Sequence, residues 1–109
     1  MDGRKRKRLE RAGWKLGSVR EFLNLSDEEV EYIELKLALA AALRARRISR
    51  KLTQAEASKL LHSSQSRVAR MEAGDRSVSL DLLVRSLLAM GASRRDLART
   101  FSAKSRRAA

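Results

Sequence analysis

The sequence predicts an all-α fold, and three features of the chain indicate it. The 109 residues include no proline, while alanine and leucine are abundant, as is typical of helical proteins. Apolar residues recur three and four positions apart along several segments, which is the spacing of one helix face. Most of these segments begin with a serine or threonine that can cap a helix. The length suits one domain, and a hydrophobic content of 43% is enough for a small core.

The two ends of the chain are expected to differ from this domain. Residues 1–11 hold six basic residues and almost no apolar ones, so we expect a flexible basic arm. Two interpretations of the arm stay open: a solubilising tail, or an arm that follows DNA phosphates or enters the minor groove. Residues 103–109 form a second basic tail. The predicted domain lies between them, at residues 12–102.

An apolar segment begins this domain. Residues 12–25 contain two of the four aromatic side chains, Trp14 and Phe22, so this N-terminal flap should pack on another part of the protein. Ser18 and Glu21 have the spacing of a capping box, which predicts a short helical extension over residues 19–24.

A long helix is predicted from Asp27 to about Arg50. Ser26 is its cap, Glu29 stands in the capping-box position, and the helix is acidic at its start and basic at its end, as the helix dipole favours. Two apolar stripes run along it, one formed by Tyr32, Leu35, Leu39 and Leu43 and the other by Val30, Ile33, Leu37, Ala40 and Ala41. Both sides therefore need cover, one from the helices that follow and the other from the flap or a second subunit.

Residues 52–74 predict two short helices joined by a tight turn. Thr53 and Glu56 form a capping box at the start of the first helix. Ser64 begins the second helix, and Gly74 supplies the left-handed residue that commonly ends one. A helix capped by Ser79 follows this motif core.

The last predicted helix begins at Ser93, with Asp96 in the capping-box position. Leu97 and Phe101 are its expected apolar anchors.

The second helix of the motif core carries a polar face that suits DNA bases. With Val68 and Met71 pointing inward, Gln65, Ser66 and Arg70 point away from the core. The amide of Gln65 can pair with adenine, the guanidinium of Arg70 can fork onto guanine, and the small Ser66 allows close approach. From the residues alone, a plain solvated helix face remains the alternative.

Other polar residues are candidates for contacts to DNA phosphates or bases. Arg67 lies at the flank of this face, and Arg76 lies in the loop that follows. The helix start at Ser64 aims free N–H groups outward, where they can meet the DNA backbone. The formal net charge of +12 makes a polyanion the expected partner, with an acidic membrane surface as the lesser candidate.

One pattern runs through this region: L-T-Q-x-E-x-x-x-x-L, then S-Q-S-x-V-x-x-x-E-x-G, then S-L-x-x-L. The residues that carry it are Leu52, Thr53, Gln54, Glu56, Leu61, Ser64, Gln65, Ser66, Val68, Glu72, Gly74, Ser79, Leu80 and Leu83. The pattern resembles the lambda-repressor-like helix-turn-helix of the Xre family, and the resemblance covers about residues 36–101. It implies a five-helix bundle in which the helix at residues 65–73 enters the major groove. It also implies that Gln54 contacts phosphate and braces Gln65, and that Arg47 forms an ion pair with Glu72.

The chain departs from the family pattern at four positions. His62 and Lys51 stand where the family usually or frequently has glycine, and Ala57 and Ser63 are smaller than the usual apolar residues. A left-handed backbone is uncommon but allowed for histidine. We therefore interpret His62 as a turn residue, in preference to a metal ligand or a pH switch. The flap is the expected filler of the space beside Ala57 and Ser63.

These features together predict a sequence-specific transcriptional regulator that binds double-stranded DNA. We expect a repressor that acts in the bacterial cytoplasm, at the nucleoid. We also expect a homodimer, for which Leu82 and Leu88 would supply apolar surface. The alternative is an antitoxin resembling the HigA group, which binds a toxin protein and represses its own operon. Charge-driven binding to DNA or RNA without sequence preference is a further alternative.

An enzyme is not expected. The chain has one histidine, no cysteine and no glycine-rich phosphate loop, so no catalytic residue, metal site or cofactor is predicted. No apolar run approaches the length of a membrane span and no signal region follows the basic start, so neither a membrane partner nor export is expected.

Overall fold

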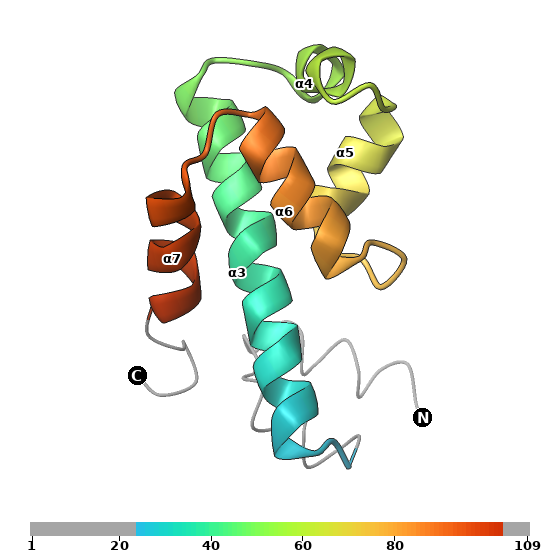
Figure 1. Ribbon diagram of the computed structural model, residues 1–109. Coiled ribbons are helices and arrows are strands. Elements are labelled where there is room, and N and C mark those ends of the chain that lie inside the picture. Colours follow the sequence, from blue (N-terminus) through green and yellow to red (C-terminus); the bar gives the residue numbers. More distant parts are fainter. Residues whose placement is uncertain (1–23, 104–109) are drawn as a thin grey trace. The chain divides into compact units, whose positions relative to one another are not determined.

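Residues 24–103 are described by a computed structural model, and they form an all-helical structure (Figure 1). Within this part of the chain there are five helices and no strand, which confirms the predicted all-α class and five-helix bundle. Residues 35–103 make one compact unit, while residues 24–34 belong to a separate one. The basic arm lies outside the described residues, and so do nearly all of the predicted helix over residues 19–24 and of the basic tail.

The first described helix, α3 (Asp27–Ser49), begins where the capping box predicts. The N–H of Ser26 donates to Oε1 of Glu29 at 3.1 Å, and the N–H of Glu29 donates to Oγ of Ser26 at 3.2 Å. Each side chain thus satisfies a backbone donor that the first helical turn would leave unpaired. Acidic residues fill the first turn and basic residues the last, which complements the helix dipole.

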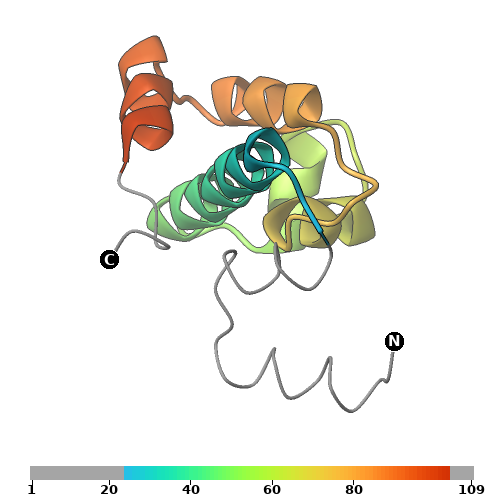
Figure 2. The ribbon, with the colours of Figure 1, turned by 90° about the horizontal axis from the view of Figure 1, so that it is seen from below.

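Four shorter helices follow, and a hydroxyl side chain caps each of them. They are α4 (Gln54–Leu60), α5 (Gln65–Glu72), α6 (Leu80–Ala89) and α7 (Arg94–Ser102), with Thr53, Ser64, Ser79 and Ser93 as the respective caps. In each case the cap oxygen accepts a hydrogen bond from the backbone N–H three residues later. Figures 1 and 2 show α5 and α7 on opposite sides of α3.

One apolar core joins these helices within residues 35–103. Its buried members are Leu39, Ala40, Leu43, Ala57, Val68, Met71, Val78, Leu83, Leu87, Met90 and Ala92. The α3 contribution combines residues of both predicted stripes, with Leu39 and Leu43 from one and Ala40 from the other. Leu97 packs against this core, whereas Phe101 is 41% exposed, so the prediction that Phe101 anchors the last helix is wrong.

Four helices end in the same left-handed turn. The residue with positive φ is Lys51 after α3, His62 after α4, Gly74 after α5 and Gly91 after α6. In each turn the next N–H donates to the carbonyl five residues back: Leu52 to Arg47 at 3.1 Å, Ser63 to Ser58 at 2.8 Å, Asp75 to Arg70 at 3.1 Å and Ala92 to Leu87 at 2.9 Å. The turn role predicted for His62 is confirmed by its φ of 51°.

The helix-turn-helix core has a buried polar atom at Ser63, one of the two positions where the chain has a smaller residue than the family usually has. Ala57 is buried in the core, and Oγ of Ser63 is buried without a hydrogen-bond partner among the described residues. A buried hydroxyl without a partner costs free energy, which a branched apolar side chain would not. Nearly all of the flap that was expected to fill this space, including Trp14 and Phe22, lies outside the described residues.

Candidate nucleic-acid interface

Helix α5 has one buried side and one polar, exposed side. Val68 and Met71 are each only 1% exposed, and they fix which side of the helix faces the core. Gln65, Ser66 and Arg70 are exposed on the remaining surface, and so is Arg67. The first two turns of α5 therefore present an amide, a hydroxyl and two guanidinium groups to a ligand.

The turn between α4 and α5 holds the start of α5 in place. Oγ of Ser64 accepts the N–H of Arg67 at 3.2 Å, so this hydroxyl caps the helix. Oγ of Ser66 lies 3.2 Å from the same hydroxyl.

At the other end of α4, the backbone and hydroxyl hydrogen bonds of Thr53 lower the pKa of Glu56, which strengthens that cap at neutral pH.

A chain of hydrogen bonds connects the exposed face of α5 to a buried carboxylate. Nε2 of Gln65 donates to Oε1 of Gln54 at 2.7 Å. Nε2 of Gln54 in turn donates to Oε1 of Glu72 at 3.2 Å. The structure thus brings together the glutamine of α4, the glutamine that starts α5 and the glutamate that ends it.

Arg47 on α3 completes this network from the core side. Its Nε lies 2.6 Å from Oε2 of Glu72 and its Nη2 lies 3.0 Å from Oε1, so the contact is bidentate. Its Nη1 also donates to the carbonyl of Leu52 at 2.8 Å. The two charged side chains are only 14% and 5% exposed, and the hydrogen bond to Glu72 is the main cause that raises the pKa of Arg47. This arrangement ties α3, the turn before α4 and the end of α5 to one another.

The loop after α5 is ordered by an aspartate. Oδ1 of Asp75 accepts the N–H of Ser77 at 2.8 Å and its hydroxyl at 2.6 Å, and these bonds are the main causes that lower the pKa of Asp75. The positive charge of Arg70 lowers this pKa further. Arg76 is exposed in this loop.

The predicted site residues thus fall into two groups. Gln54, Gln65, Glu72 and Arg47 share one hydrogen-bond network, while Ser64 and Ser66 lie at the start of α5 beside it. The three remaining arginines, Arg67, Arg70 and Arg76, are separate exposed side chains on α5 and its following loop. The bond between Gln54 and Glu72 was not predicted, because only the fold brings those side chains within reach.

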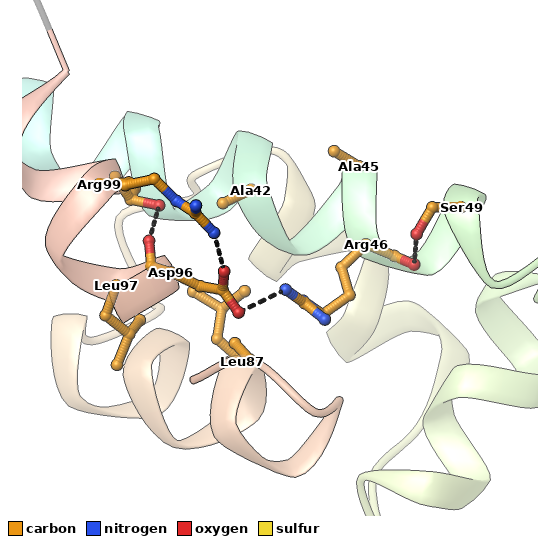
Figure 3. Close-up of a pocket in the computed structure, with 10 residues that line it drawn as sticks. Ala42, Ala45, Arg46, Ser49, Leu87, Asp96, Leu97 and Arg99 are labelled. Atoms are coloured by element: carbon orange, nitrogen blue, oxygen red, sulfur yellow. Dashed lines mark hydrogen bonds and ion pairs between the residues drawn. The ribbon is translucent and has the colours of Figure 1, made fainter. Parts of the chain in front are cut away.

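A second cluster of charges lies on the other side of α3. Arg46, Asp96 and Arg99 are among the residues that line an open cavity of about 490 Å³ between α3 and α7 (Figure 3). Nη2 of Arg46 lies 3.0 Å from Oδ2 of Asp96, and Arg99 pairs with the other oxygen of the same carboxylate. The backbone N–H of Ser93, its hydroxyl, Arg99 and Arg46 lower the pKa of Asp96 to about 2. The sequence analysis placed Asp96 only in the capping-box position after Ser93.

Two kinds of site are not found in the described residues. Between residues 24 and 103, no three acidic, histidine or cysteine side chains are grouped so that they could hold a metal ion. No helix in that same stretch is both long enough and apolar enough to span a membrane.

Comparison with known proteins gives one match. A family model described as helix-turn-helix matches residues 43–99, which include the whole of α4, α5 and α6 and most of α7. Neither the curated proteins nor the solved structures gave a match.

Proposed function

Because the chain belongs to the Xre, lambda-repressor-like helix-turn-helix family of DNA-binding transcriptional regulators, we propose that it is a repressor that recognises a specific double-stranded DNA sequence. Such a protein would act in the cytoplasm, at the nucleoid. The observation that carries the proposal is the exposed polar face at the start of α5, opposite its two fully buried apolar residues. A helix that offers amide and guanidinium groups beyond the protein surface suits the major groove, where each base pair presents a distinct pattern of donors and acceptors.

In this proposal three side chains read bases. Gln65 and Arg70 are the candidates for paired hydrogen bonds to a purine, each worth about 1–3 kcal/mol of discrimination against the wrong base. Ser66 is small enough to let α5 lie close to the base edges.

Four other residues are candidates for contacts that position the protein. Gln54 is the first residue of α4, and Ser64 is the cap at the start of α5. Arg67 lies on α5, and Arg76 lies in the loop that follows it. In the proposal they contact phosphates or bases at the edge of the groove. Contacts to phosphates release counterions, so affinity should fall steeply as salt rises.

The first test is a selection of bound sequences from random duplex DNA at two salt concentrations. An enriched sequence, and above all an inverted repeat, is the expected result. Retention of many unrelated sequences, with no enrichment at either salt concentration, would instead support charge-driven binding.

Arg70→Ala then separates base reading from phosphate contact. The variant should lose much more affinity for the enriched sequence than for random duplex DNA. Arg95→Ala is the matched control, because Arg95 is an exposed arginine of α7, on the other side of α3 from α5. Equal losses of Arg70→Ala on both DNAs would assign Arg70 to phosphate.

The proposal includes a homodimer, since regulators of this kind usually bind two half-sites. Of the two leucines expected to supply apolar surface, Leu88 is 47% exposed on α6, whereas Leu82 packs against the core, so the prediction for Leu82 is wrong. Leu60 on α4 is also 47% exposed. Sedimentation of the free protein and of its DNA complex tests this part. A complex with one chain per enriched sequence would contradict it.

The antitoxin alternative adds a protein partner to the same DNA-binding role. Leu37 on α3 is 44% exposed, which leaves an apolar side chain of this helix accessible to a toxin. Coexpression with the product of a neighbouring gene, followed by copurification and a growth-rescue assay, tests this alternative. Growth inhibition that this chain relieves would support it, and a harmless neighbour that does not copurify would count against it.

A further inference from the structure

We propose that Lys36 on α3 is a positioning residue for DNA binding, because it holds against α3 the turn that presents Arg76. The inference rests on the proposed function, since it assumes that Arg76 contacts a phosphate. Lys36 itself is only 9% exposed, so it offers DNA little surface of its own. Its effect on DNA binding would pass through the turn.

The turn after α5 is built around Asp75. The carbonyl of Asp75 accepts the N–H of Val78 at 3.0 Å, which closes a four-residue turn. Its carboxylate accepts the N–H of Ser77 at 2.8 Å and the hydroxyl of Ser77 at 2.6 Å. Arg76 and Ser77 are the two middle residues of the turn, and both are exposed. The position of Arg76 therefore depends on the position of Asp75.

Both ends of this turn are packed. A Cβ on Gly74 would lie only 2.8 Å from Cδ2 of Leu37 and 3.8 Å from Cβ of Ala40. The backbone at Gly74 therefore runs directly against α3. At the other end, Val78 is 3% exposed and belongs to the apolar core. The turn thus has a close contact with α3 immediately before Asp75.

Lys36 lies on the side of α3 that makes this contact. It precedes Ala40 by four residues, and side chains four positions apart are neighbours on one helix face. Ala40 is one of the two residues that Gly74 approaches, so Lys36 is one helical turn from the contact. A lysine is rarely buried to this extent unless an opposite charge is near.

Asp75 supplies the opposite charge. Hydrogen bonds from Ser77 are the main causes that lower the pKa of Asp75, and the positive charges of Arg70 and Lys36 lower it further. Attraction between the ammonium of Lys36 and the carboxylate of Asp75 favours the position of the turn against α3. Without that charge, the turn keeps its internal hydrogen bonds but loses one of the interactions that orient it.

This support comes from a part of the chain that the family model does not match. The match begins at residue 43, whereas Lys36, Leu37 and Ala40 precede it. The turn with Arg76 lies inside the matched residues. The earlier part of α3 therefore adds to the helix-turn-helix a contact that the matched residues alone do not contain.

A double-mutant cycle tests the inference. Lys36→Met removes the charge and keeps an unbranched side chain on the buried face, and Arg76→Ala removes the phosphate contact. The affinity for duplex DNA and its dependence on salt are measured for both single variants and for the double variant. Arg44→Met is the matched control, because Arg44 is an exposed basic residue of the same helix and also loses one charge.

The two single variants should resemble each other. Arg76→Ala should reduce the slope of log affinity against log salt by about 0.9, the contribution of one phosphate contact. Lys36→Met should weaken binding by about threefold or more and should also reduce this slope. In the Arg76→Ala background, Lys36→Met should change neither quantity. Lys36→Arg keeps the charge and should keep the wild-type slope, and the effect of Arg44→Met should be the same with and without Arg76.

Additive effects of Lys36→Met and Arg76→Ala would overturn the inference, because Lys36 would then act independently of Arg76. Unchanged affinity and slope in Lys36→Met would overturn it as well. If Arg76→Ala has no effect, Arg76 contacts no phosphate and the inference fails, while base reading by α5 stands. Thermal unfolding of each variant checks that the fold is intact, and Lys36→Gln decides the question if Lys36→Met unfolds.

The cycle is run on the enriched sequence and on a random-sequence duplex, because phosphate contacts carry no sequence information. If no sequence is enriched, the proposed sequence-specific function fails, and the random duplex still decides the role of Lys36. If an enriched sequence is found but the effects of the two variants add, only the role of Lys36 fails.

Discussion

Arg46 and Arg47 are adjacent on α3, yet they hold helices on opposite sides of it. Arg47 reaches Glu72 at the end of α5, and Arg46 reaches Asp96 in the first turn of α7 (Figures 1 and 2). The side chains of the first pair are 14% and 5% exposed, and those of the second pair are 29% and 27% exposed. The first pair has two hydrogen bonds between its charged groups and the second has one.

The difference shows that burial and geometry, not the kind of charge, set what an ion pair contributes. Removing one partner of a buried pair leaves the other charge without solvent or counterion, which costs much free energy. A pair that water still reaches contributes little, because water screens the attraction and replaces the lost partner. The helix that carries the proposed base readers is therefore held by the stronger of the two contacts.

The largest expected effect is that of Glu72→Ala. It leaves the guanidinium of Arg47 buried without its carboxylate, so the free energy of unfolding should fall by about 3–5 kcal/mol. Denaturant titration followed by circular dichroism measures it. Asp81→Ala is the control, because Asp81 and Arg85 form an exposed pair at 3.7 Å. A loss no greater than that of the control would contradict the assigned role of the buried pair.

Replacing each arginine by lysine sharpens the comparison. Arg47→Lys keeps the charge but loses the bidentate contact and the bond to the carbonyl of Leu52, so we expect a loss of about 1–2 kcal/mol in the free energy of unfolding. In Arg46→Lys, the lysine can still form the single hydrogen bond to Asp96, so the free energy of unfolding should change very little. Equal losses for the two variants, measured by the same titration, would show that the extra hydrogen bonds of Arg47 contribute nothing.

Arg46→Ala should cost about 0–1 kcal/mol, the range for a partly exposed ion pair. The measurement is again the free energy of unfolding, now compared with that of Glu72→Ala. A cost near 3 kcal/mol would mean that the two pairs are equivalent, and the contrast between the two sides of α3 would fail.

The smallest effect is a dependence on pH. Hydrogen bonds from Ser93, with Arg99 and Arg46, hold the pKa of Asp96 at about 2, below the ordinary value of 3.8. Because the folded-state pKa is the lower one, the ionised carboxyl stabilises the folded protein above about pH 4, and this contribution is lost as the pH falls toward 2. Asp96→Asn should therefore flatten the fall in stability between these pH values. An unchanged slope, with Asp81→Asn as the control, would contradict the lowered pKa.

Much of the fold could be predicted because local rules determine it. The caps at Ser26, Thr53, Ser64, Ser79 and Ser93 begin helices in the structure at the predicted places. A cap acts on backbone groups three residues away, so its signal is contained in a few letters of sequence.

Contacts between distant residues were harder to predict. Arg46 and Asp96 are 50 positions apart, and no local pattern pairs them. Arg47 and Glu72 were paired only through the family resemblance, since spacing alone does not show which basic residue of α3 turns toward α5. Phe101 was expected to anchor the last helix, but its spacing from Leu97 does not say whether a neighbour covers the last turn of a terminal helix.

The left-handed turns at Lys51 and His62 have a consequence for the motion of α4. These two non-glycine residues flank this seven-residue helix, and each is held in a conformation that costs such residues about 1 kcal/mol or more. Brief opening of the segment would release that strain at both ends, so its amides should exchange with solvent faster than those of α6, which ends at a glycine. Lys51→Gly together with His62→Gly should slow this exchange, which native-state hydrogen exchange measures. The helix that presents Gln54 would then open more readily than α6, and a contact of Gln54 with DNA in the proposed complex would slow the exchange of its amides.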